Sequence, residues 1–127
     1  MEWDLARGLR EYVRQVAQAC GCSGEAFSVQ LETPLSAYIP LENRVESFPE
    51  LDVALLWDAR TGWSSVLETA GNELITLTYL TDSLVPSPDV VAAFAANPAG
   101  GASTPIASTE DAAALVGEYA ALRPLAS

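Results

Sequence analysis

The sequence predicts an α+β domain with an N-terminal helix, an antiparallel sheet of about five strands and two C-terminal helices packed on one face of the sheet. Apolar residues recur at helical spacing up to residue 20, alternate with polar residues from Phe27 to Leu80, and return to helical spacing after Ser87. The length of 127 residues fits one hydrophobic core. We therefore expect a single domain over residues 1–127.

The first helix is predicted from Asp4 to Cys20, and Gly21 is a plausible stop. One apolar stripe runs along it, formed by Leu5, Leu9, Tyr12, Val13, Val16 and Cys20. Half of the chain's six basic residues, Arg7, Arg10 and Arg14, lie on the opposite side.

Two short strands are predicted next, over residues 27–31 and 35–41, with a turn near Thr33 and Pro34. Pro40 cannot donate a ladder hydrogen bond, so the second strand should be short or lie at an edge. Residues 42–50 are predicted to form a loop.

A three-stranded meander follows. Residues 51–57 are apolar on both faces apart from Asp52, which is typical of a central strand or of a strand at a subunit interface. Turns at residues 58–62 and 70–72 separate it from strands at 63–69 and 73–80.

Two helices are predicted in the last third of the chain. Ser87, Pro88 and Asp89 form a favourable helix start, and this helix should stop before Asn97. Residues 97–107 are small, polar and rich in Pro and Gly, which predicts a flexible linker. Ser108 or Thr109 then caps a final helix that carries Leu115, Val116, Tyr119 and Leu122.

Composition limits the possible partners. Seventeen acidic residues against six basic ones give a net charge of −11, which disfavours nucleic acid and anionic membranes and favours a basic protein. No apolar run approaches the roughly 18 residues of a membrane span, and the N-terminus does not resemble a signal peptide, so we expect a cytoplasmic protein. Arginine supplies every basic residue, which suggests the GC-rich genome of an actinobacterium.

The absence of histidine excludes a Ser-His-Asp or Cys-His mechanism within this chain. Catalysis by strand carboxylates would fall to Glu32 or Glu68, although both also fit a solvated sheet face. Cys20 and Cys22 could form half a soft-metal site or a strained local disulfide, and free thiols are the simpler interpretation. Carboxylates at positions 42, 46, 50 and 52 lack a calcium-binding pattern. We expect no metal site and no cofactor, and a non-enzymatic role is favoured.

Three groups of residues are candidate binding elements. Trp57 and Trp63 stand at the ends of a predicted hairpin, where indoles either form a stacking platform or cover the core. A pocket between sheet and helices would add Tyr79 and Phe94 to them. The third group is the outward face of the first helix, with Arg7, Arg10 and Arg14. This face would bind an anionic ligand or the acidic surface of a second copy, or it is an ordinary solvated helix face.

The segment from Leu51 to Asp58, Gly62-Trp63, Glu68-Thr69, Leu74-Ile75 and the run Leu84-Val85-Pro86-Ser87-Pro88 resembles a small actinobacterial domain family of unknown function. This resemblance implies a compact cytoplasmic α/β domain and brings no activity or catalytic residues. Element order and acidity also give a looser, fold-level likeness to secretion-chaperone-like domains.

These observations lead to three hypotheses about function. The first is a non-enzymatic binding module, a homodimer, which engages another protein through an apolar sheet face or the groove between sheet and C-terminal helix. The second is a small-molecule-binding protein or atypical enzyme with a pocket between sheet and helices. The third is an acidic mimic of nucleic acid.

Overall fold

The computed structural model describes residues 2–21, 27–31, 35–71, 73–105 and 112–122. They confirm the α+β fold class, with an N-terminal helix, a five-stranded antiparallel sheet and two C-terminal helices. The elements in chain order are α1 (Glu2–Ala19), β1 (Ser28–Gln30), β2 (Ser36–Pro40), β3 (Asp52–Asp58), β4 (Gly62–Glu68), β5 (Leu74–Tyr79), α2 (Pro88–Ala96) and α3 (Ala112–Leu122).

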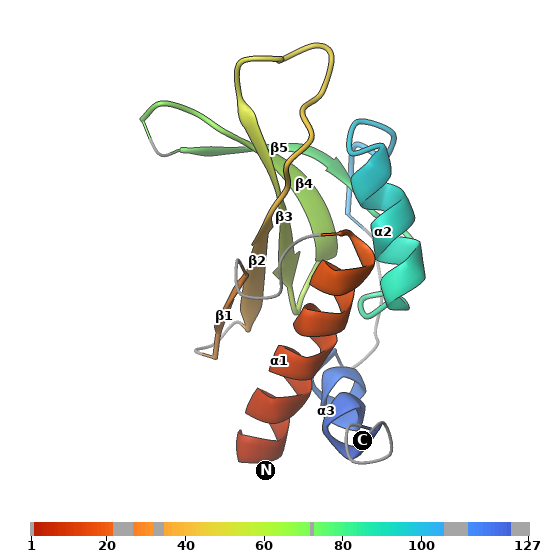
Figure 1. Ribbon diagram of the computed structural model, residues 1–127. Coiled ribbons are helices and arrows are strands. Elements are labelled where there is room, and N and C mark those ends of the chain that lie inside the picture. Colours follow the sequence, from red (N-terminus) through yellow and green to blue (C-terminus); the bar gives the residue numbers. More distant parts are fainter. Residues whose placement is uncertain (1, 22–26, 32–34, 72, 106–111, 123–127) are drawn as a thin grey trace.

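The sheet is a meander in which every strand pairs with its sequence neighbours (Figure 1). The apolar strand β3 is central, as its sequence predicts. Pro40 ends β2, which has β1 on one side and β3 on the other. The β1 pairing reaches only as far as Tyr38, so Pro40 lies beyond the end of β1, where its missing N–H breaks no ladder.

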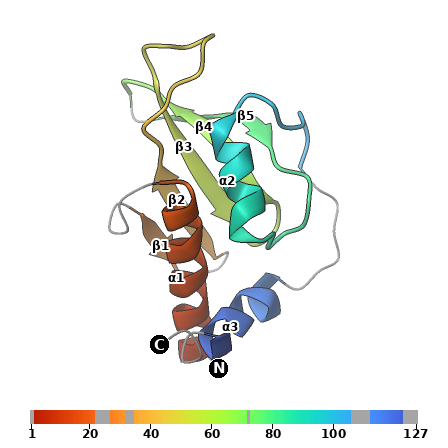
Figure 2. The same ribbon diagram turned by 45° about the vertical axis from the view of Figure 1, so that its right-hand side comes forward.

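Helices α1 and α2 cover one face of this sheet, which we call the helix face, and α3 packs on α1 (Figures 1 and 2). Opposite residues in an antiparallel pair share a face, so the pairs Trp57–Trp63 and Leu55–Ser65 both point toward the helices. The main core joins that face to the helices through Leu9, Tyr12, Val13, Val16, Ile39, Leu55, Trp57, Trp63, Leu84, Val91, Phe94 and Val116.

A second, smaller core lies at the end of the sheet that the loop between β2 and β3 covers. Its buried members are Val45 of the loop, Val53 of β3 and Leu67 of β4, with Leu41, Leu51 and Leu77 packed around them. This end of the helix face is therefore covered by a loop instead of a helix.

Close packing of α1 and α3 depends on a glycine. A Cβ atom at Gly8 would overlap the carbonyl oxygen of Val116, so only glycine lets the two helices approach this closely. Gly117, on the same helix as Val116, has nothing within 4 Å of its Cβ position.

The start of α2 follows the prediction, with Pro88 in its first turn, although the Ser87 side chain makes no capping hydrogen bond. The segment after α2 lies along β5: the backbones of Tyr79 and Ala102 exchange two hydrogen bonds of 2.8 Å. Gly101 permits this approach, because a Cβ there would overlap the Tyr79 carbonyl oxygen. The flexibility of residues 97–107 stays a prediction, and residues 106 and 107 lie outside the described part of the chain.

Candidate functional site

The two indoles that sequence analysis proposed as binding elements lie in the core. Trp57 and Trp63 are both fully buried. The Trp57 Nε1–H donates to the Leu84 carbonyl oxygen at 2.7 Å, and the Trp63 Nε1–H donates to the Tyr12 hydroxyl at 3.0 Å. Both polar atoms are thus satisfied internally.

Tyr12 extends this buried network to the connection between β5 and α2. Its hydroxyl donates to the Pro86 carbonyl oxygen at 2.6 Å. Burial is the main cause that raises the pKa of Tyr12, so the hydroxyl stays protonated as a donor. The two indoles and Tyr12 therefore anchor the connection at Leu84 and Pro86.

Tyr79 and Phe94, the other two predicted pocket residues, do come together. They line a cleft of about 690 Å³ between the end of β5, helix α2 and the segment at residues 100–102, which we call the β5–α2 cleft. Asp82 and Asn97 supply polar groups at its wall. Phe94 also belongs to the main core with Trp57 and Trp63, whereas Tyr79 is opposite Ser64, on the open side of the sheet.

The three predicted arginines of α1 differ in their surroundings. Arg14 forms a fork with the nearly buried Glu11, with Nη2–Oε2 at 2.6 Å and Nε–Oε1 at 3.1 Å. Arg10 is exposed and Arg7 is half-buried. The guanidinium of Arg14 is therefore already engaged by a carboxylate of its own helix.

The sheet face away from the helices, which we call the open face, is concave. Ser28 of one edge strand and Leu74 of the other line the same groove of about 360 Å³, together with Tyr38 and Leu56. No helix in the described ranges covers this face (Figure 1). Curling of the sheet brings its two edges toward each other around the groove.

Tyr38 crosses the open face. Its hydroxyl donates to Glu68 Oε2 at 2.6 Å, from β2 to β4 across β3. Burial, followed by this hydrogen bond, raises the pKa of Tyr38 to about 12. Beneath it, Ala54 and Val66 have no exposed surface although no described helix covers them.

The beginning of β5 is uncovered on both sides. Leu74, Ile75 and Thr76 are three consecutive exposed residues, with Leu74 at 45% and Ile75 at 50% exposure. A strand covered on one side would alternate buried and exposed residues. The β4–β5 hairpin extends away from the helices, which leaves this segment free (Figure 1).

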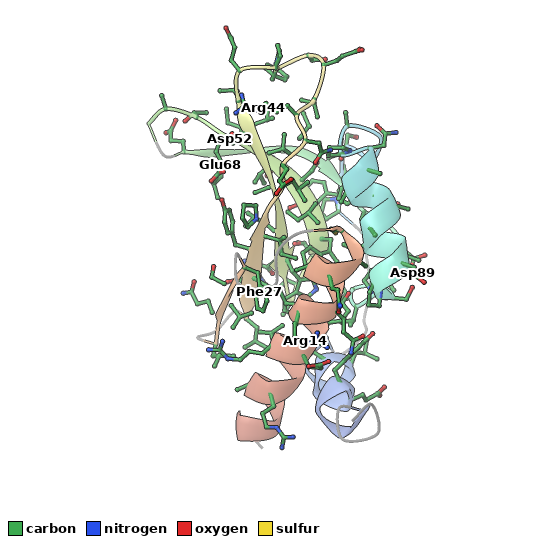
Figure 3. All side chains as sticks on the ribbon, viewed as in Figure 1. Arg14, Phe27, Arg44, Asp52, Glu68 and Asp89 are labelled. Atoms are coloured by element: carbon green, nitrogen blue, oxygen red, sulfur yellow. The ribbon has the colours of Figure 1, made fainter. Side chains whose placement is uncertain are left out.

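Carboxylates surround this uncovered segment. Figure 3 shows Asp52 and Glu68 at one end of the sheet, with Arg44 beside them. Arg44 pairs with Asp52 at 2.8 Å and donates to the Pro49 carbonyl oxygen at 3.0 Å. The same end carries exposed carboxylates at Glu42, Glu46, Glu50 and Glu73, so its potential is strongly negative.

The remaining sequence candidates are placed as follows. Cys20 is half-buried, whereas Cys22 and Glu32 lie outside the described residues. Within the described ranges no three His, Cys, Asp or Glu side chains gather as a metal site, and no helix has the length and apolarity to cross a bilayer.

Sequence reasoning missed the exposed β5 segment because alternation alone predicts one buried face. The acidic residues at positions 68 and 73 flank two adjacent large apolar residues, and this pattern is the signal that would have indicated the exposed segment.

Residues 12–97 match a family whose description is a family of unknown function (DUF6292), so the resemblance to a family of unknown function is confirmed. No curated protein and no solved structure gives a significant match.

Proposed function

We propose that this chain, which belongs to the family of unknown function DUF6292, is a non-enzymatic module that binds another protein at the concave open face of its sheet. The observation that carries the proposal is the uncovered apolar surface of Leu74 beside the groove that Tyr38 and Leu56 line. Concave apolar surfaces with a few fixed polar groups are typical binding sites.

The charge of the protein supports a basic partner. The chain carries a net charge of −11, and the carboxylates of Asp52, Glu68 and Glu73 lie near the exposed end of the groove. Complementary charge speeds association and rejects acidic competitors. We propose the cytoplasm of an actinobacterium as the setting of this interaction.

A homodimer remains part of the proposal. The apolar strand that suggested it, β3, is covered by helices on one face and partly by Tyr38 on the other. A second copy at the open-face groove would compete with the foreign partner for the same surface. Light scattering at high protein concentration tests the dimer.

The binding proposal is tested by capture from a bacterial lysate with a matched pair of variants. Leu74→Asp places a charge at the groove, whereas Phe48→Ser removes a similarly exposed apolar residue that does not line it. We expect Leu74→Asp to lose the captured proteins and Phe48→Ser to retain them. Equal capture by the wild type and both variants would contradict the proposal.

The β5–α2 cleft supports a second candidate function, the binding of a small molecule. Phe94 gives it an aromatic wall, and its volume of about 690 Å³ suits a metabolite. Native mass spectrometry of the purified protein tests this function. Replacement of the exposed lining residue Ala93 by Trp should displace any co-purifying metabolite.

A further inference from the structure

We infer that the bound partner is an extended segment with basic and apolar side chains, which adds as a sixth strand along the outer edge of β5 at Leu74–Thr76. By outer edge we mean the side of β5 that faces away from β4. The inference rests on the proposed function and names its partner and mode of binding.

Backbone hydrogen bonds show which residues point outward along β5. The Thr69 N–H donates to the Glu73 carbonyl oxygen at 3.0 Å, so the polar backbone groups of Glu73 face β4. In an antiparallel strand, the backbone N–H and C=O groups of successive residues point alternately to one neighbouring strand and to the other. The N–H and C=O groups of Leu74 and Thr76 therefore face away from β4.

The same edge already accepts a strand at its other end. The Tyr79 N–H and C=O groups face outward and pair with Ala102 at 2.8 Å in both directions. The carbonyl oxygen of Pro98 fixes this segment further, because it accepts from Ser65 Oγ at 2.7 Å and from Thr78 Oγ1 at 2.6 Å. The pairing of the chain's own segment with this edge therefore ends at Tyr79.

Beyond that point the edge is free. Within the described part of the chain, no segment pairs with the outward backbone groups of Leu74 and Thr76. Exposed edges of this kind are templates for strand addition, and proteins ordinarily blunt them with charge, proline or a covering segment. Among the described residues, Ala102 covers the Tyr79 end of this edge.

Side chains around the free edge define the chemistry of the added strand. Leu74 and Ile75 offer apolar surface on opposite faces, and Glu68 and Glu73 add negative charge on either side of the segment. A second copy would bring two chains of −11 together with their Glu73 carboxylates close by. A basic strand meets the same surface with favourable charge, and this selects a foreign segment over self-pairing.

The test uses the full chain and a synthetic ten-residue peptide of alternating Arg and Val, with an alternating Glu and Val peptide as control. Thr76→Pro removes the outward N–H and leaves the ladder to β4 intact, whereas Thr76→Val keeps that N–H. Fluorescence anisotropy measures the affinity, and hydrogen exchange follows the amides of residues 74–76.

We expect the basic peptide alone to bind, more weakly as salt rises, and to protect the outward amides of Leu74 and Thr76. Thr76→Pro should weaken binding by about tenfold, because the added strand then lacks its hydrogen bond to this N–H. Thr76→Val should bind like the wild type. If Thr76→Pro does not fold, Glu73→Arg serves instead and should also weaken the basic peptide.

Several results would overturn the inference: equal binding of both peptides, no binding of the basic one, unchanged affinity in Thr76→Pro and Glu73→Arg, or a β5-paired dimer without peptide. Capture that depends on Leu74 but not on Thr76→Pro would reject strand addition and leave the proposed open-face function standing. Loss of the Leu74 dependence itself would reject the proposed function.

Discussion

The Trp63 indole nitrogen and the Tyr12 hydroxyl lie 3.0 Å apart in the core and link the sheet to the first helix. The two rings are tilted by 52°, with centroids 6.2 Å apart. Because the same hydroxyl donates to the Pro86 carbonyl oxygen, one buried oxygen ties together β4, α1 and the connection that leads into α2.

Replacement Tyr12→Phe should destabilise the protein. It leaves the Trp63 N–H and the Pro86 carbonyl oxygen buried without their partner, at a cost of about 1–3 kcal/mol for each group left unsatisfied. Tyr119→Phe is the control, because its ring also packs on Tyr12, with centroids 4.8 Å apart. Urea unfolding should show a change below about 0.5 kcal/mol for this control. Equal stability of Tyr12→Phe and the wild type would contradict the role of the network.

Replacement Gly8→Ala should disrupt the packing of α3 on α1. The new methyl group would overlap the Val116 carbonyl oxygen, so the helices must separate, and overpacking typically costs about 1–3 kcal/mol. Gly117→Ala has open space and should stabilise α3, by up to about 1 kcal/mol from helix propensity. Thermal unfolding of the two variants should therefore shift in opposite directions. A shift in the same direction would show that the contact is not tight.

Tyr38 should make stability fall at alkaline pH. Its pKa rises from 10.0 to about 12 in the folded protein, through burial, Glu68 and, more weakly, Asp52. Between these values the folded state holds the proton that the unfolded state has lost, so stability decreases as pH rises. Tyr38→Phe should flatten this decrease. Burial raises the pKa of Tyr12 and Tyr119 as well, so the contribution of Tyr38 is the difference in tyrosinate absorbance and unfolding midpoints between Tyr38→Phe and the wild type. Identical profiles would contradict it.

The Pro98 carbonyl oxygen should give non-additive mutational effects. Ser65→Ala and Thr78→Val each remove one donor and leave the other, so each should cost about 1 kcal/mol. The double variant leaves that buried oxygen without either donor and should cost more than the sum. A double-mutant cycle in urea measures the difference, and hydrogen exchange at Ala102 should rise with it. Strict additivity would mean that a water replaces the lost donors.

The order of elements could be predicted from the sequence because each pattern has a local cause. Alternation from Phe27 to Leu80 gives the meander, and Pro88 behind Ser87 starts α2. The part of the sheet that the helices cover could not be predicted, because it depends on how far the helices reach across the sheet. The exposed Ile75, on the helix face, marks where that coverage ends.

The candidate site was predicted only in part. Tyr79 and Phe94 line the same cleft, but Phe94 lies in the core on the helix face and Tyr79 is opposite Ser64 on the other face. Trp57 and Trp63 were open to two interpretations, and their buried partners Leu84 and Tyr12 come from distant parts of the chain. Periodicity carries no information about such long-range hydrogen bonds.

Leu77 has a consequence for how this family tolerates changes in chain length. The pairing of β4 with β5 passes from Val66–Thr76 to Ser65–Thr78, so Leu77 is one extra residue, and Thr76 and Thr78 point to opposite sides of the sheet. Deletion of Leu77 would restore regular alternation and leave Thr76 opposite Val66 and Thr78 opposite Ser65, each on its present face. A one-residue deletion should therefore be tolerated better here than elsewhere in the strand, where it would reverse every residue on one side of the gap.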